Sequence, residues 1–262
     1  MQEQKYSRPI FTSGRVIKKE SFDNLRDFPR DAMDIFYADY SDGIISGFEI
    51  TYDMEKKDIG ISKGILKRDG MIIILQGCSV SFAVFADREI CVKLRFGEID
   101  RTDDFESVYV ETGISAGFNV GADEIELARF RLEDGAELRK KSEYKGTYDF
   151  VTPYNTLNLV NVKYAGLHAP TFSPELLKIF AGEIMSLEKP DVIDISFALT
   201  CLNSSIVHKE CIIQYLNSRV GMRNNISFDM EFSNEGIHEV LMIIAGRSGS
   251  SAKAKSEVGI AF

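Results

Sequence analysis

Histidine, cysteine and carboxylate side chains are too thinly spread along the chain to predict a metal site. His208 and Cys211 lie three positions apart in a stretch with helical periodicity, so they share a helix face, and Cys201 lies ten positions earlier. A structural zinc site needs four ligands and usually takes them from closely spaced Cys or His pairs. The chain has no C-x-x-C pair, so we expect no metal. We expect the four cysteines to be buried free thiols, which behave as small hydrophobic residues. They are Cys78, Cys91, Cys201 and Cys211.

Catalytic patterns are equally weak. The chain has three histidines and no G-x-S-x-G elbow, so a serine hydrolase triad has no support. The segment Gly246–Lys253 reads GRSGSSAK, which departs from the phosphate loop G-x-x-x-x-G-K-[ST]. Two carboxylate groups, Asp103-Asp104 and Asp123-Glu124-Glu126, suit glycoside hydrolysis only if they face each other across a cleft. On turns they are interpreted as surface charge, and we predict no enzyme activity, no catalytic residue and no cofactor.

Length, charge and hydropathy place the chain among ordinary folded, soluble proteins. It has 262 residues, 44% of them hydrophobic and 27% charged, which allows one large or two modest domains with an ample core. The formal net charge of −9 disfavours a general nucleic-acid binder, which needs a basic face. No apolar run reaches the ~18 residues that span a bilayer, and the start Met1–Tyr6 lacks a signal-peptide core. We expect synthesis in the cytoplasm, no nucleic-acid binding and no membrane insertion.

The stretch from residue 40 to about 135 predicts an all-β region. Ile59–Leu66 and Met71–Leu75 are apolar-rich runs that flank Asp69-Gly70, the pair favoured in a two-residue type I′ hairpin turn. Gly64 and Gly77 mark positions for a bulge or a close backbone approach. Other alternating runs predict strands at Ile44–Tyr52, Cys78–Phe85, Ile90–Phe96, Val108–Glu111 and Ile125–Leu132. Short strands at close spacing indicate an antiparallel β-sandwich or a partly closed barrel.

From residue 173 onward the apolar spacing becomes helical. Ser173 and Pro174 predict a helix start, and Pro190 a stop, around a stripe of Leu176, Phe180, Ile184 and Leu187. A second helix is expected over Asp191–Leu202, with Ile195, Leu199 and Leu202 facing inward. A third is expected to begin at Ser204 or Ser205, and a fourth at Ser233 or Asn234 with an end at Gly246. Four short helices with brief connections predict a small helical domain.

These patterns predict an α+β fold, an N-terminal antiparallel β-sandwich or partly closed barrel followed by a small helical domain. In the N-terminal segment, Ser21 predicts a short helical turn to Arg26, and Pro29 a second one to about Tyr37. Phe36, Tyr37 and Tyr40 are expected to pack this segment onto the sheet. The predicted units are an N-terminal arm with short helices (1–39), a β domain (40–150), a linker with a possible strand (151–172), a helical domain (173–246) and a mobile C-terminal tail (247–262).

Three segments read together resemble a known group of proteins. Asp42–Gly47 reads DGIISG, Ile59–Gly70 reads IGISKGILKRDG with glycines six apart, and Ile125–Leu132 reads IELARFRL before Glu133-Asp134-Gly135. This order of turn and strand motifs resembles structural proteins of phage tails and phage-like contractile particles, at the baseplate and the fibre attachment region. The resemblance covers roughly residues 40–140. The chain departs from long tail fibres because it has no internal repeat.

The resemblance implies a non-enzymatic structural subunit at the baseplate of such a particle, attaching or forming part of the receptor-binding fibre apparatus. Its implied partners are other baseplate and tail-fibre proteins and further copies of itself, and its implied location is the virion or a released particle. Tyrosines that interfaces favour are Tyr6, Tyr37, Tyr40 and Tyr154. The alternative is a carbohydrate-binding module of a cell-surface or tail protein that uses Tyr52 or Phe96, although the chain has no tryptophan for a sugar platform.

Overall fold

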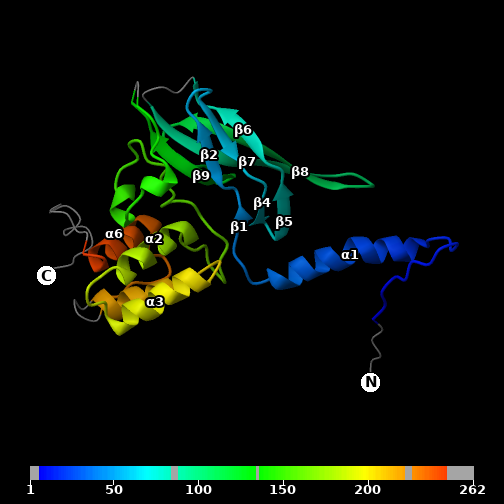
Figure 1. Cartoon of the computed structure of the whole chain (residues 1–262). Coiled ribbons are helices and arrows are strands. Elements are labelled where there is room, and N and C mark those ends of the chain that lie inside the picture. Colours follow the sequence, from blue (N-terminus) through cyan, green and yellow to red (C-terminus); the bar gives the residue numbers. More distant parts are fainter. Residues whose placement is uncertain (1–5, 84–87, 134–135, 222–225, 247–262) are drawn as a thin grey trace.

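The computed structural model describes residues 6–83, 88–133, 136–221 and 226–246. The predicted tail 247–262, with most of Gly246–Lys253, and most of the turn Glu133-Asp134-Gly135 lie outside these ranges. Figure 1 shows a β-rich body, a group of helices beside it, and one helix that projects away from both. The fold class is α+β, as the sequence predicts, and the described ranges contain no closed barrel. No helix within them is long and apolar enough to cross a membrane.

The described β region consists of three antiparallel sheets of three strands each. The first has the order β1–β4–β5, with β1 at Gly43–Gly47, β4 at Gly64–Arg68 and β5 at Met71–Leu75. The second has the order β2–β3–β6, with β2 at Ile50–Asp53, β3 at Asp58–Ile61 and β6 at Cys78–Ser81. The third has the order β8–β7–β9, with β8 at Glu106–Ala116, β7 at Glu89–Arg101 and β9 at Glu124–Arg131.

The predicted hairpin at Asp69-Gly70 is confirmed between β4 and β5. Both turn residues have positive φ, 48° for Asp69 and 79° for Gly70, as a type I′ turn requires, and Arg68 pairs with Met71. The carboxylate of Asp42 accepts the backbone N–H of Asp69 at 3.1 and 3.2 Å. The Asp42-Gly43 and Asp69-Gly70 motifs therefore contact each other at one end of the first sheet.

Two strands that the sequence predicts as continuous are each divided between two sheets. Gly47 and Phe48 have φ values of 79° and 57°, so the run Ile44–Tyr52 leaves β1 and enters β2 of the second sheet. The run Ile59–Leu66 is split in the same way into β3 and β4. Gly64 marks the crossing, since a Cβ there would collide with the ring of Phe48. The contact that requires a glycine at position 64 is thus with a side chain, whereas the prediction was a bulge or a close backbone approach, and the single strands are wrong.

The third sheet is longer than the sequence predicts. The run Ile90–Phe96 extends into the 13-residue β7, and Val108–Glu111 into the 11-residue β8. Ile125–Leu132 is confirmed as β9, whereas the strand predicted over Cys78–Phe85 ends at Ser81 in β6, and Val84 and Phe85 lie outside the described residues. The register between β7 and β9 shifts at Val92/Lys93, which is a β-bulge.

The helices lie beside the third sheet (Figure 1) and carry most of the predicted stripes. The predicted starts at Ser173 and Ser233 are confirmed, because each hydroxyl accepts a backbone N–H in the first helical turn. The third helix begins at Lys209, with His208 rather than Ser204 or Ser205 as its N-cap residue, and a π-helical turn Asn217–Gly221 follows it. The described helices of this group are α2 (Pro174–Met185), α3 (Val192–Asn203), α4 (Lys209–Leu216) and α6 (Asn234–Ile244).

The inward face predicted for α3 is wrong. Leu199 is 52% exposed and Leu202 is also exposed, while Asp194 is buried with Phe197, Ala198 and Cys201. Asp194 accepts a hydrogen bond from the Tyr215 hydroxyl at 2.8 Å and forms an ion pair with Arg219. These partners satisfy the only charged side chain of α3, so the charge turns inward and an apolar face is left outside.

Residues 151–172 join the sheets to the helices through the core. The predicted strand at Thr156–Tyr164 is replaced by isolated bridges, such as Arg129 to Asn158 and Ile44 to Tyr164. Gly43 permits the second of these, because a Cβ there would lie 2.7 Å from the backbone of Ala165. A single cluster of buried apolar side chains runs from Ile44 in β1 to Leu241 in α6. The segment therefore packs as part of the body.

The N-terminal segment forms one long helix, α1 (Lys19–Phe36), in place of the two short turns that the sequence predicts. Pro29 lies inside it, where the missing N–H leaves one carbonyl without its helical bond. None of the residues of α1 is buried, and Phe36, predicted to pack on the sheet, is 77% exposed. Figure 1 shows α1 extending away from the body.

Candidate functional site

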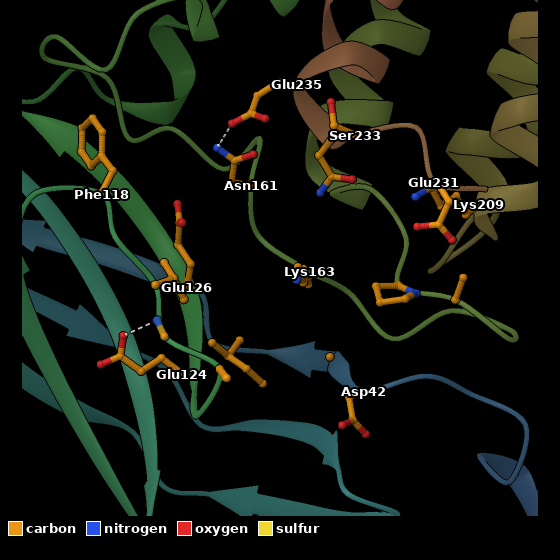
Figure 2. Close-up of a pocket in the computed structure, with 18 of the residues that line it drawn as sticks. Asp42, Phe118, Glu124, Glu126, Asn161, Lys163, Lys209, Glu231, Ser233 and Glu235 are labelled. Atoms are coloured by element: carbon orange, nitrogen blue, oxygen red, sulfur yellow. Dashed lines mark hydrogen bonds between the residues drawn. The ribbon is translucent and has the colours of Figure 1, made fainter. Parts of the chain in front are cut away.

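A cleft of about 710 Å³ separates the third sheet from the helices (Figure 2). One wall comes from β9 and the loop before it, including Phe118, Glu124 and Glu126. The other wall comes from the segment 161–170, from Lys209 and from residues 230–235. Asp42, Gly43 and Arg68 also line it, so the cleft is bordered by the first sheet, the third sheet and the helices.

Glu124 is held as an anion on the sheet side of the cleft. Its carboxylate accepts the Gly121 N–H at 2.9 Å and pairs with the ammonium of Lys93 at 2.6 Å and with the guanidinium of Arg95 at 2.9 Å. The Gly121 hydrogen bond, followed by that of Lys93, lowers the pKa of Glu124 from 4.5 to about 2. A general acid needs a raised pKa, so Glu124 is unsuited to that role.

Glu126 and Arg129 form a second buried ion pair on the same strand. Residues three apart on a regular strand face opposite sides, but the bulge opposite Lys93 brings these two to one side. The Arg129 Nε donates to Glu126 Oε1 at 2.6 Å, and its guanidinium lies 4.9 Å from the centre of the Phe118 ring. The prediction that the carboxylates near residue 124 are plain surface charge is wrong for Glu124 and Glu126, which are structural.

The helix side of the cleft carries two lysines that form no ion pair with any residue in the described ranges. Lys163 is exposed, and Lys209 is half-buried at the start of α4. Burial lowers the pKa of Lys209, while the charges of Glu231 and Asp229 act in the opposite direction and that of Lys163 in the same direction. The neighbouring Asn161 amide donates to Glu235 at 2.6 Å, which ties the segment to α6 (Figure 2). Lys163 and Lys209 therefore add positive charge to a wall that also carries Glu231 and Glu235.

The structure separates the remaining residues that the sequence suggested for chemistry. Asp103 and Asp104 are exposed between β7 and β8. His208 accepts the Leu167 N–H at 3.0 Å through Nδ1, which occupies one of its two nitrogens. No group of three or more metal-binding side chains gathers within the described residues.

The four cysteines are free, but only two of them are buried as expected. Burial raises the pKa of Cys91 and of Cys201 to about 12, so both thiols stay protonated and unreactive at neutral pH. Cys78 and Cys211 are exposed, because each lies on the outer side of its element.

The aromatic residues considered for sugar binding are not available as platforms. Phe96 is buried beneath the guanidinium of Arg68, which lies 5.2 Å from the ring centre. Tyr52 is half-buried, and its hydroxyl donates to the Leu138 carbonyl at 3.0 Å. Of the four interface tyrosines, Tyr6 and Tyr154 are exposed, whereas Tyr37 and Tyr40 are half-buried and pack edge to face.

Two exposed apolar faces were missed by the sequence analysis. The first is α1, whose large apolar side chains are between 51% and 77% exposed. The second is the outer side of α3, with Val192, Leu199 and Leu202. The helical spacing of Phe22 and Leu25 was the available signal for the first, and the lack of outward charge in residues 192–203 was the signal for the second.

Comparisons with known proteins add three distant structures. No protein-family model and no curated protein sequence matches the chain. A chain of the TssK–TssF–TssG baseplate subcomplex of the type VI secretion system aligns with a TM-score of 0.38 and 9% identity, over 92% of this chain and 100% of that chain. TssK in a crystal structure aligns with a TM-score of 0.35 and 8% identity, over 98% and 70%. A chain of the type VI secretion baseplate complex aligns with a TM-score of 0.36 and 11% identity, over 92% and 100%. Scores this low carry no argument about fold or function.

Proposed function

We propose that this chain is a structural subunit of a phage tail or contractile phage-tail-like particle. It works at the baseplate, where it attaches or forms part of the receptor-binding fibre apparatus. The observation that carries the proposal is α1, an amphipathic helix that projects from the body with large apolar side chains more than half exposed, among them Phe22, Leu25 and Phe36. A helix of this kind gains stability only when another surface covers it, which is the expected condition of a subunit inside an assembly.

The motifs behind the sequence resemblance support the same proposal, because they form one connected unit. Asp42 holds the turn at Asp69, and Gly43 lets residues 164 and 165 approach β1. The third motif, Ile125–Leu132, supplies β9 and one wall of the cleft. These residues build a scaffold rather than a catalytic centre, as a structural subunit needs.

The cleft supports an assembly role better than an enzymatic one. Its carboxylates Glu124 and Glu126 are neutralised by cations of the same sheet. The lysines Lys163 and Lys209 lie opposite them and suit an acidic segment of a neighbouring subunit. No observation favours the carbohydrate-binding alternative, since Phe96 is buried and the Tyr52 hydroxyl is occupied.

Deletion of the gene in the host that carries it tests the proposed place in the particle. We expect deletion to yield particles that lack the fibre apparatus, or no complete particles, and we expect a plasmid copy to restore them. Electron microscopy of purified particles and mass spectrometry of their fibre proteins measure both outcomes. Particles with a full set of fibres and normal host-cell binding would refute the proposal.

A further inference from the structure

The far end of the third sheet is a two-stranded ribbon that leaves the body. Strand β9 pairs with β7 only as far as Arg95, whereas β8 pairs with β7 to its last residue, Arg101. Figure 1 shows the far ends of β7 and β8 extending away from the sheets. Residues 97–107, here called the acidic hairpin, are all exposed. Because a two-stranded ribbon is marginally stable in water, contact with a partner stabilises it.

The acidic hairpin has a strong excess of negative charge. It contains five acidic residues and one basic residue, Arg101, which pairs with Glu106. The other four carboxylates form no ion pair with any described residue. They are Glu98, Asp100, Asp103 and Asp104.

Large apolar side chains accompany these charges. Phe105 and the adjoining Tyr109 are each 73% exposed, and Ile99 is 41% exposed. The N–H of Thr102 donates to the Phe105 carbonyl at 2.8 Å, which closes the turn and fixes the tip. Exposed aromatic side chains within a charged rim are typical of a protein interface.

The segment before α1 has the opposite charge. Residues 6–19, here called the basic segment, contain four basic residues and no acidic residue. They are Arg8, Arg15, Lys18 and Lys19, and none of them forms an ion pair with a described residue. The basic segment also exposes Ile10, Phe11, Val16 and Ile17. The Ser7 carbonyl accepts the Asn24 amide at 3.2 Å, which holds the segment beside α1.

The junction between α1 and the body determines where the basic segment lies. The ammonium of Lys67, which is only 7% exposed, donates to the carbonyls of Tyr37, Ala38 and Tyr40 at 2.6, 2.9 and 2.8 Å. A cation also complements the negative end of the helix dipole. The C-terminal end of α1 is thereby fixed to β4. The 18 residues of α1 span about 27 Å and carry the basic segment away from the body of its own chain (Figure 1).

We propose that the basic segment of one copy of this chain docks on the acidic hairpin of a second copy. The two surfaces have opposite charge, and both expose apolar side chains that the contact buries. A foreign basic protein on the hairpin would leave the basic segment without a partner, whereas this contact satisfies both surfaces. Each copy contributes a different surface, so the contact is heterologous and builds a ring or a chain of copies. The inference rests on the proposed assembly function and names one partner for it.

Sedimentation equilibrium of the purified full chain tests the contact through its dependence on salt. We expect reversible association that weakens by about tenfold when the salt concentration rises from about 0.05 M to about 0.5 M, because salt screens exposed charges. A wild type that is monomeric at low salt overturns the inference. Association that salt leaves unchanged or strengthens also overturns it, since such a contact is apolar.

Charge reversal tests which surfaces meet. Asp103→Lys with Asp104→Lys reverses the hairpin, and Arg8→Glu with Arg15→Glu reverses the basic segment. Each double variant alone should associate about tenfold more weakly or not at all, because attraction becomes repulsion. An equimolar mixture of the two should associate again, since each segment then faces a hairpin of opposite charge on the other variant. A mixture that stays monomeric contradicts the pairing.

The matched control is Glu55→Lys with Glu188→Lys, which changes the net charge by the same amount as the hairpin variant. Both positions are exposed and lie outside the two surfaces, so association should stay at the wild-type level. Equal weakening by the control and the hairpin variant indicates an effect of net charge and overturns the inference. Unchanged thermal midpoints show that all the variants are folded.

The outcomes keep this inference separate from the proposed function. A chain that is monomeric when purified, and needs Asp103 and Asp104 to enter particles, binds a different basic protein, which overturns the contact between copies alone. A purified oligomer with the expected charge dependence that never enters particles supports the contact and refutes the particle assignment.

Discussion

Glu124 both lines the cleft and stabilises the third sheet. Its side chain joins Lys93 and Arg95 of β7 to the loop at Gly121, and it is nearly inaccessible to solvent. A lowered pKa in the folded state means that the anion stabilises the fold. This contribution is complete above the ordinary pKa of 4.5 and is lost as the pH falls toward about 2.

We therefore expect Glu124→Gln to lower the free energy of unfolding by about 2 kcal/mol at pH 7, because Lys93 and Arg95 lose their anion. The same variant should lose less stability than the wild type between pH 4.5 and pH 2. Urea unfolding at several pH values measures both. The matched control is Glu106→Gln, whose partner Arg101 is well exposed, at a cost below ~1 kcal/mol. Parallel pH profiles of wild type and Glu124→Gln would contradict the account.

At the scale of single residues, the sequence allowed only part of this to be predicted. Glu124 and Glu126 were visible as carboxylates, but their partners depend on the β7–β9 register and on a bulge at Val92/Lys93. The burial of Asp194 was unpredictable for the same reason, since its partners Arg219 and Tyr215 are more than 20 positions away in the chain. Long-range partners of this kind leave no local pattern.

Among the elements, the β4–β5 hairpin was the most predictable, because Asp69-Gly70 fixes the turn and the turn fixes the register. Gly70 has a φ of 79° and open space where an added Cβ would lie, so only its backbone conformation resists substitution. We expect Gly70→Val to cost about 1–2 kcal/mol, which lowers the thermal midpoint by about 3–6 °C.

Gly113→Ala is the matched control for Gly70→Val, since Gly113 has no neighbouring atom within 4 Å of an added Cβ and no positive φ. Its midpoint should stay within about 1–2 °C of the wild type, as for a mild strand substitution. Differential scanning calorimetry of the wild type, Gly70→Val and Gly113→Ala measures the three thermal midpoints. A Gly70→Val protein with the wild-type midpoint would disprove the type I′ turn.

The junction of α1 gives a prediction about an element. Lys67→Met leaves three carbonyls without a donor, so we expect a loss of about 2–3 kcal/mol in the free energy of unfolding. We also expect faster chymotrypsin cleavage near Phe36 and Tyr37, because α1 is no longer held to β4. Lys63→Met, at an exposed lysine close in sequence, is the control and should change neither quantity. Equal cleavage rates for all three proteins would show that Lys67 does not fix α1.

The fold of the whole molecule was predictable in class but not in its connections. Apolar residues recur every two positions in the β region and every three to four positions in the helices, and this difference predicts the α+β class. The splitting of the predicted strand Ile44–Tyr52 between two sheets depends on left-handed backbone at Gly47 and Phe48, which an alternating sequence pattern does not reveal. The apolar outer face of α3 was misassigned because α3 is apolar on every side, so its periodicity does not select an inward face.

The exposed apolar helix faces and the lysines of the cleft have one common explanation in the whole molecule. The apolar faces of α1 and α3 are exposed to water, which is unfavourable in an isolated chain. These faces and the two lysines of the cleft are accessible to neighbouring proteins. The proposed place in a multi-subunit particle explains why they are exposed together in one chain.

The most direct test of the central claim is the sedimentation of this chain in lysates of its own host. Particles are induced, separated on a density gradient and analysed by quantitative mass spectrometry against their sheath and tube proteins. The account predicts that the chain sediments with the particles at a fixed ratio to those proteins through repeated gradients. If the chain stays wholly in the low-mass fractions while complete particles sediment without it, the proposed function is wrong.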